Sequence, residues 1–303
     1  MLKAAFSTLG CPDWTWQDLL HYGPVYGYDG VEIRLIERET DLLCRPEFAV
    51  GVRGRRRNEL DAAMFSVCGL SSSVRFDYPE ASERREQVII GREYIDLAGE
   101  LGASFVRVFG DTLPPNADAA TRQATIGNIA HGLQTLGEYG EQHGVDILIE
   151  THGDYADSIL ASETLSRVES PAVGVLWDTH HPWRFCGEQI KETFLRLSPW
   201  IRHTHWKDSV SGPSSAEGAT SHAAADAAHR LMSGHQHANY VPFGKGEFPA
   251  ARCMSLLKGA VYHGWFSLEW EKMWHPELEG PHAILPSFPP AIRNLYEKLS
   301  HPA

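Results

Sequence analysis

Residues 146–181 have the sequence DILIETHGDYADSILASETLSRVESPAVGVLWDTHH, which contains one complete strand–helix–strand unit. Its two short apolar runs, Asp146–Glu150 and Gly174–Trp177, have the length and composition of buried strands. The helical pattern between them, at Glu163–Val168, supplies the crossover that two parallel strands require. This stretch therefore predicts a parallel sheet that is covered by helices.

The same alternation continues to both ends of the chain. Six further strands are predicted, at Ala4–Thr8, Gly30–Arg34, Met64–Cys68, Phe105–Phe109, Ile201–His205 and Trp265–Glu269. Helical patterns separate them, at Trp14–His21, Arg84–Leu101, Thr121–His143, Gln189–Leu197 and Ala250–Tyr262, with a last one at Pro290–Leu299. Eight such units predict an α/β fold, a closed (β/α)8 TIM barrel in a single domain over residues 1–303.

A doubly wound open sheet is the structural alternative. Its dinucleotide-binding form would need a GxGxxG turn after the first strand, and Thr8–Pro12 lacks that pattern. The barrel is therefore favoured. One segment, residues 209–246, departs from the alternation as a long loop after the seventh strand. We expect it on the active face of the barrel, as a functional lid or an insert.

Composition excludes several classes of function. The net charge of −12 argues against nucleic-acid binding. No apolar run approaches the roughly 20 residues that cross a bilayer, and the first residues lack a secretory pattern. The five cysteines are scattered without a CxxC pair, so they predict neither disulfides nor a thiolate metal site. A cytoplasmic protein with a small-molecule substrate, no nucleic acid and no membrane is expected.

Four consecutive predicted strands end in potential ligands, namely Glu150, Asp178, His205 and Glu269. Because the carboxyl ends of barrel strands converge on one mouth, these side chains can meet although they lie far apart in sequence. Three carboxylates gathered there would repel one another, and a divalent cation removes that repulsion. Oxygen and imidazole ligands suit Mn2+, Mg2+, Co2+ or Zn2+.

The period of a strand leaves an ambiguity within these motifs, since residues two apart share a face. The pattern alone does not choose between the members of three pairs: Glu269 and Glu271, His203 and His205, Glu150 and His152.

These motifs resemble those of the sugar phosphate isomerase/epimerase superfamily, the xylose isomerase-like TIM barrels. The resemblance covers essentially the whole chain and rests on five stretches: Gly27–Arg34, Glu150–Gly153, Trp177–Pro182, His203–Asp208 and Gly264–Glu269. It implies that Glu150, Asp178, His205 and Glu269 bind one divalent metal ion, with Mn2+ expected first. It also implies a sugar or sugar-derived substrate, and homo-oligomers are common in the family.

The resemblance also assigns substrate contacts. His181 matches a substrate-contacting histidine, and Lys207 matches a second contact, with a salt bridge to a neighbouring acid as the alternative. His152 is a third candidate for lining the pocket. Arg107 and Arg34 lie near strand ends, where they could bind an anionic group or form a buried ion pair with Glu32 or Asp111.

The chemistry that the resemblance implies is proton transfer beside a metal-polarised carbonyl. Glu150 and Glu269 would be the catalytic residues, one accepting a proton and the other returning it. Isomerisation or epimerisation is the expected reaction, with dehydration of a cyclic polyol or keto acid as the alternative. A non-catalytic sugar-binding or partner subunit is the alternative from another class. The retention of both glutamates argues against it, since binding alone needs no acid–base pair.

Two departures from the motifs of the family narrow the choice of reaction. Ketose 3-epimerases carry a glutamate six residues after the first ligand and an arginine six residues after the metal histidine, and here these positions hold Ala156 and Ser211. A standard ketose 3-epimerase is therefore not expected. The endonuclease branch of the superfamily has further histidine ligands after strands three and four, where this chain has Gly69–Ser73 and Gly110. DNA repair is not expected either.

Overall fold

A computed structural model of the chain describes residues 2–212 and 236–299. Eight parallel strands close into a barrel, and each is hydrogen bonded to its neighbours in the order β1-β10-β7-β6-β5-β4-β3-β2. The strands are β1 (Lys3–Ser7), β2 (Gly30–Ile33), β3 (Ser66–Arg75), β4 (Phe105–Phe109), β5 (Asp146–Glu150), β6 (Val173–Asp178), β7 (Ile201–Trp206) and β10 (Trp265–Leu268). The predicted (β/α)8 TIM barrel is confirmed.

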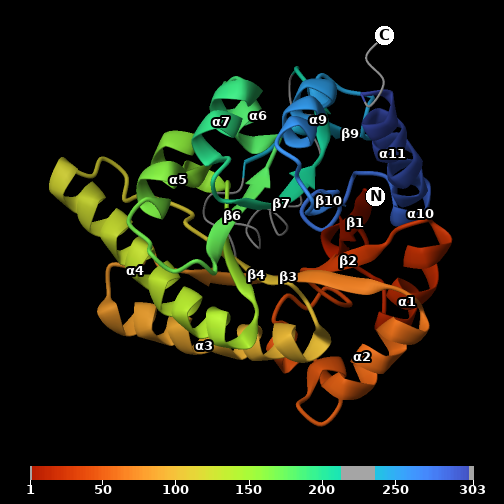
Figure 1. Cartoon of the computed structure of the whole chain (residues 1–303), viewed down its shortest axis with the longest axis horizontal. Coiled ribbons are helices and arrows are strands. Elements are labelled where there is room, and N and C mark those ends of the chain that lie inside the picture. Colours follow the sequence, from red (N-terminus) through yellow and green to blue (C-terminus); the bar gives the residue numbers. More distant parts are fainter. Residues whose placement is uncertain (1, 213–235, 300–303) are drawn as a thin grey trace.

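Helices surround the barrel, and the longest two, α3 and α4, lie side by side (Figure 1), α3 against β3 and β4 and α4 against β5 and β6. The helices are α1 (Trp16–Val25), α2 (Arg53–Ala62), α3 (Ala81–Leu101), α4 (Ala119–His143), α5 (Ser158–Leu165), α6 (His181–Phe185), α7 (Ile190–Leu197), α9 (Ala250–Gly259), α10 (Pro281–Ile284) and α11 (Phe288–Lys298). Both α3 and α4 end at a left-handed glycine, Gly102 and Gly144, because that conformation suits a residue without a side chain.

Two predicted boundaries were wrong for local reasons. Met64 has a left-handed backbone and an exposed side chain, so β3 begins only at Ser66. The strand then runs through Gly69, where the ring of Phe105 occupies the space that a side chain would need. The helix α5 begins earlier than its apolar pattern suggested, because Asp157 caps it by accepting hydrogen bonds from the first backbone amides.

The long loop after β7 contains structure that its composition did not indicate. Its two ends pair as a small antiparallel sheet of β8 (Asp208–Val210) and β9 (Asn239–Val241). Asp208 accepts hydrogen bonds from the backbone amides of Gly244, Gly246 and Phe248, which anchors the returning chain beside the barrel mouth. Residues 213–235 of the predicted loop lie outside the described residues.

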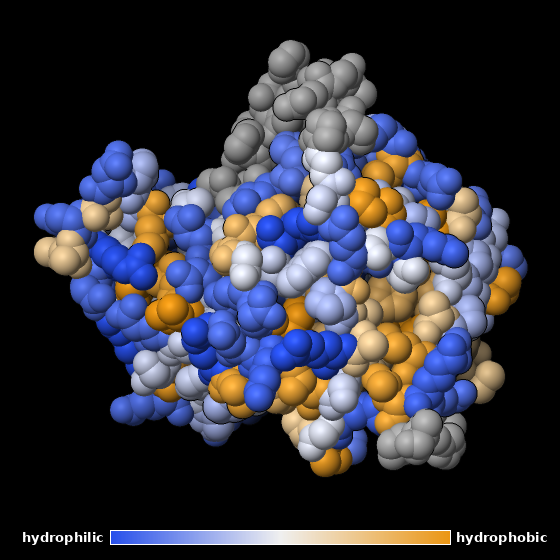
Figure 2. All heavy atoms as spheres, turned by 90° about the horizontal axis from the view of Figure 1, so that it is seen from above, coloured by the Kyte–Doolittle hydropathy of each residue, from blue (hydrophilic) through white to orange (hydrophobic). Residues whose placement is uncertain are grey.

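The surface is mainly polar. Figure 2 shows hydrophilic residues over much of one face, with apolar residues in smaller groups between them. Within residues 2–212 and 236–299, none of the helices is long and apolar enough to span a membrane.

Two glycines in α4 provide a matched test of packing. A Cβ atom at Gly140 would lie 2.3 Å from the carbonyl oxygen of Val145, whereas one at Gly127 would meet nothing within 4 Å. We expect Gly140→Ala to destabilise the fold by about 1–3 kcal/mol, because backbone atoms cannot move aside cheaply. We expect Gly127→Ala to stabilise it by about 0.5–1 kcal/mol through helix propensity. Denaturant unfolding measures both changes, and equal shifts in one direction would contradict this account.

Candidate metal centre

The four predicted ligands lie at the carboxyl-terminal mouth of the barrel. Glu150 and Asp178 are the last residues of β5 and β6, and Glu269 directly follows β10. His205 in β7 pairs in register with Asp178 on one side and with Ser267 of β10 on the other. Closure of the barrel therefore brings these side chains together, with ligand atoms all within 4.8 Å of one another.

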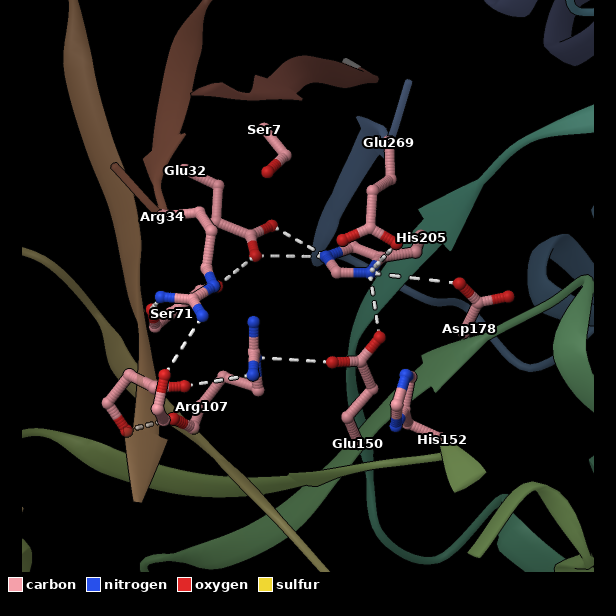
Figure 3. A network of polar contacts seen from close by, with 12 residues as sticks. Ser7, Glu32, Arg34, Ser71, Arg107, Glu150, His152, Asp178, His205 and Glu269 are labelled. Carbon is pink, nitrogen blue, oxygen red and sulfur yellow. Dashed lines mark hydrogen bonds and ion pairs between the residues drawn. The ribbon is translucent and has the colours of Figure 1, made fainter. Parts of the chain in front are cut away.

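The imidazole of His205 is at the centre of this cluster (Figure 3). Its Nδ1 lies 3.1 Å from Glu269 Oε2, 3.3 Å from Glu150 Oε1 and 3.9 Å from Asp178 Oδ2. Nδ1 of His205 is buried, and Oδ2 of Asp178 is paired with Nζ of Lys207 at 2.9 Å. Three acidic side chains thus converge on one ring nitrogen.

Asp178 is held by the turn that follows β6. Its Oδ1 accepts hydrogen bonds of 2.9 Å from the backbone amides of His180 and His181. These bonds fix the carboxylate and leave Oδ2 directed into the cluster (Figure 3). A ligand that is oriented before a cation arrives loses less entropy on binding.

Glu32 holds the other side of the histidine, and the sequence reasoning did not assign it to the site. Its carboxylate is fully buried in β2 and accepts hydrogen bonds from Nε2 of His205, at 2.8 and 2.9 Å, and from Nε2 of His203, at 2.9 Å. Ser71 and Ser267 also donate to it. When Nε2 of His205 carries the proton that Glu32 accepts, Nδ1 keeps its lone pair. That lone pair can then bind a cation.

Lys207 is a buried cation behind the cluster. Its Nζ lies 2.5 Å from Glu269, 2.6 Å from Glu271 and 2.9 Å from Asp178. It also donates to Nε2 of His181 at 3.1 Å. These contacts support the salt-bridge alternative for Lys207, and Glu271, which the sequence left paired with Glu269 as a possible ligand, turns to the lysine.

The other predicted contacts line a narrow pocket at the mouth. Arg107, His152 and His181 all face it, together with Glu150 and Glu269. Arg107 Nε is 3.1 Å from Glu150 Oε2, and Nδ1 of His152 is 3.0 Å from Asp111. The remaining lining residues are Leu9, Arg34, Phe109, Glu271 and Trp274.

Burial and mutual repulsion govern the ionisation of the carboxylates. Burial raises the pKa of Asp178 to about 6, although Lys207 opposes the shift. Burial also raises the pKa of Glu269, but His205 and Lys207 outweigh it and hold the value well below the ordinary range. Burial raises the pKa of Glu150 as well, but Arg107 and His205 together outweigh it and lower the value.

The imidazole responds in the opposite sense. Burial lowers the pKa of His205, but the carboxylates of Glu269 and Glu32 outweigh it and raise the value well above normal. The negative charge of the cluster therefore stabilises positive charge at its centre. In the absence of a metal ion, that positive charge is a proton on His205.

The donor set fits a divalent metal ion. Three carboxylates and one imidazole are suitable ligands for such a cation, which would offset the repulsion between the acids. The atoms of the set lie close enough to share one ion, since all are within 4.8 Å of one another. A second group of possible ligands, formed by Glu32, His203 and His205, is already joined by hydrogen bonds through Nε2 of each histidine.

The chain is a closed (β/α)8 barrel, and its cluster of acids and imidazole lies at the carboxyl-terminal mouth. This places it in the class of barrel proteins whose functional site lies at the strand ends. Within that class, this chain belongs to the xylose isomerase-like TIM barrel family, whose model matches residues 25–286.

Characterised relatives in this family include epimerases and dehydratases. The chain is 28% identical over 197 residues to 3-dehydroshikimate dehydratase of Bacillus anthracis, a match over 63% of this chain and 65% of that protein. It is 24% identical over 203 residues to fructoselysine 3-epimerase of Shigella flexneri, over 64% of this chain and 62% of the relative. The chain thus matches less than two thirds of the length of each.

Solved structures share the fold. The IolI protein, crystallised with a zinc atom, superposes with a TM-score of 0.75 at 17% sequence identity, over 98% of this chain and 99% of that one. At this identity the similarity shows the architecture alone. The zinc atom belongs to that protein.

Proposed function

We propose that the protein is a metal-dependent isomerase or epimerase that moves a proton next to a carbonyl of a sugar or sugar-derived substrate. The observation that carries the proposal is the convergence of three carboxylates on Nδ1 of His205 at the barrel mouth. In this proposal Glu150, Asp178, His205 and Glu269 hold the metal ion. When bound, a divalent cation supplies polarisation of the substrate carbonyl, which makes the neighbouring C–H bond more acidic.

Glu150 and Glu269 are the proposed catalytic residues. Both face the pocket, and both have a lowered pKa, so each carboxylate is ionised and able to accept a proton. Arg107 positions Glu150, and Lys207 positions Glu269. In our proposal one glutamate removes the proton, and the other returns it to the opposite face or to the adjacent carbon.

His152 and His181 are proposed to lie against the bound substrate, since both line the pocket. Nδ1–H of His181 donates to the carbonyl oxygen of Thr151, and Lys207 donates to its Nε2, so the ring is held in one orientation. The ring of His152 is held through Nδ1, which donates to Asp111. Arg107 contributes the positive end of the same pocket.

A dehydratase is the second candidate, and the match to 3-dehydroshikimate dehydratase favours it. Its first step is the same removal of a proton beside a carbonyl, followed by loss of a β-hydroxyl as water. Position 156 is a buried alanine and Ser211 is committed to Glu247, so neither supplies the ionic group of a standard ketose 3-epimerase. This leaves dehydration as a direct competitor.

The two candidates are separated by one experiment. Protein loaded with Mn2+ is incubated in D2O with a panel of ketoses, inososes and 3-dehydroshikimate, and the products are followed by NMR and mass spectrometry. We expect exchange of a C–H proton next to the carbonyl. An isomer whose mass differs only by the exchanged deuterium supports the isomerase, and loss of one water supports the dehydratase. Binding of substrates without exchange or product by any member would contradict both.

We expect Glu32→Gln to weaken metal binding by about 10–100-fold, the usual cost of removing a partner that orients a ligand histidine. The amide cannot accept from His203 and His205 as a carboxylate does. Titration calorimetry with Mn2+ measures the change. Ser267→Ala, which removes only a 3.2 Å hydrogen bond to Glu32, is the matched control and should bind nearly as tightly as wild type. Unchanged affinity in Glu32→Gln would count against this role.

A further inference from the structure

Arg34 is a buried cation at the candidate site that the proposed chemistry does not use. It follows β2 directly, is 1% exposed, and lines the mouth pocket with Glu150 and Glu269. Figure 3 shows its guanidinium on the same side of the site as that of Arg107. Two positive side chains thus flank one wall of the pocket.

The hydrogen bonds of Arg34 go to uncharged groups. Its Nη2 donates to Ser73 Oγ at 2.9 Å, and its Nη1 makes longer contacts with the carbonyl oxygens of Thr40 and Ser71, at 3.4 and 3.5 Å. Its Nε is buried and has no hydrogen-bond partner among the residues that the structure describes. The guanidinium therefore retains donor capacity and its full charge.

The acids that could have neutralised Arg34 are directed elsewhere. Glu32 accepts from His203 and His205, and Asp111 pairs with Arg75 and His152. Across residues 2–212 and 236–299, the ion pairs include none that joins Arg34 to a carboxylate within 4.0 Å. The buried ion pair suggested as an alternative from sequence is therefore absent for Arg34, whereas Arg107 forms one with Glu150.

A buried charge without a counter-ion is costly, because water no longer solvates it. Burial and the neighbouring charge of Arg107 lower the pKa of Arg34 to about 10, although Tyr94, Glu150 and Glu269 oppose the shift. In the proposed function these two glutamates share their negative charge with a divalent cation. Glu271, the third carboxylate of the pocket lining, pairs with Lys207, so none of the pocket's acids pairs with Arg34.

We propose that the substrate itself supplies this anion, as a carboxylate that pairs with Arg34 while its carbonyl faces the glutamates. A carboxylate matches the planar donors of a guanidinium and carries the single negative charge that one unpaired arginine neutralises. A phosphate dianion would leave excess negative charge in a pocket that is already acidic. This inference rests on the proposed function and narrows its substrate class to sugar acids or cyclic hydroxy acids.

The test uses two probes that differ in charge alone. Both 3,4-dihydroxybenzoate and 3,4-dihydroxybenzamide offer the same adjacent oxygens to a cation, but only the first carries a carboxylate. We expect wild-type protein loaded with Mn2+ to bind the acid at least about tenfold more tightly than the amide, the effect of one charge-assisted hydrogen bond. Titration calorimetry gives both affinities and, separately, the affinity for Mn2+.

The preference should disappear in Arg34→Met while the affinity for Mn2+ remains. Arg53→Met is the matched control, because Arg53 is another largely buried arginine, paired with Glu100 on the outer helices. It should keep the preference. If Arg34→Met does not fold, Arg34→Gln takes its place in the same measurement. If neither variant folds, the comparison of acid and amide binding by the wild-type protein decides the test.

The outcomes separate the two proposals. Binding of Mn2+ with equal affinity for acid and amide, or a preference that survives in Arg34→Met, overturns the role of Arg34 and leaves the metal site standing. Failure to bind Mn2+ contradicts the proposed function instead. The two probes are therefore also compared without metal, where a preference that depends on Arg34 still supports the carboxylate contact and its absence overturns it.

Discussion

Glu150→Gln and Glu269→Gln are each expected to slow solvent exchange of the substrate C–H proton by about 10²–10⁴-fold, the usual contribution of a positioned acid or base. Each substitution keeps the shape of the side chain and removes the negative charge that accepts the proton. The measurement is deuterium incorporation by NMR at saturating substrate and metal. Both variants should lose exchange, because removal and return of the proton use opposite members of the pair.

Loss of exchange could also arise from loss of the metal ion, since both residues are proposed ligands. Calorimetry with Mn2+ is therefore run beside the kinetics, and rates are compared at metal concentrations that saturate each variant. Glu277→Gln is the control, because Glu277 is an acid of the same loop region that pairs with His275 outside the cluster. Exchange at the wild-type rate in both site variants would refute the acid–base assignment.

Removal of the metal ion is expected to abolish activity and to lower the melting temperature. A cation that binds only the folded state stabilises it by about 2.7 kcal/mol when free metal is roughly 100 times the dissociation constant. For a chain of 303 residues that corresponds to a loss of roughly 4 °C on chelation. Addition of Mn2+ or Co2+ should restore both properties.

Asp178→Asn tests the same site without a chelator. The variant loses the charge of Oδ2, the carboxylate oxygen that lies 3.9 Å from Nδ1 of His205, and should show a much smaller thermal shift on addition of Mn2+. A chelator saturated with Mn2+ beforehand controls for effects of the chelator itself. Full activity in protein shown to be free of metal would disprove the proposed role of the cation.

Much of the fold was predictable from local pattern. The crossover from Asp146–Glu150 through a helix to the next strand repeats along the chain, and parallel strands with helical crossovers close into a barrel when eight are present. The boundary errors arose from single residues, since Met64 has a left-handed backbone before β3 and Asp157 caps α5 earlier than the apolar pattern suggests. The pairing of β8 with β9 was missed because it joins residues about 30 positions apart.

The sequence by itself determined the candidate cluster as a set of strand ends, since Glu150, Asp178, His205 and Glu269 each terminate a predicted strand. It could not choose between residues two apart, because they share a face of the strand. The structure separates two of these pairs: Nδ1 of His205 faces Glu150, Asp178 and Glu269, whereas His203 pairs with Glu32 and Glu271 pairs with Lys207.

Only the tertiary structure decided which charges find partners. Glu32 reaches a histidine 171 residues away, and Arg34, two residues later, reaches no carboxylate among the described residues. Strand pattern determines where along a strand a side chain emerges, but closure of the barrel sets its distance to every other strand. Electrostatic energy depends on those distances and on burial. The protonation state of each group, and whether a charged group has a counter-ion, are therefore set only when the barrel closes.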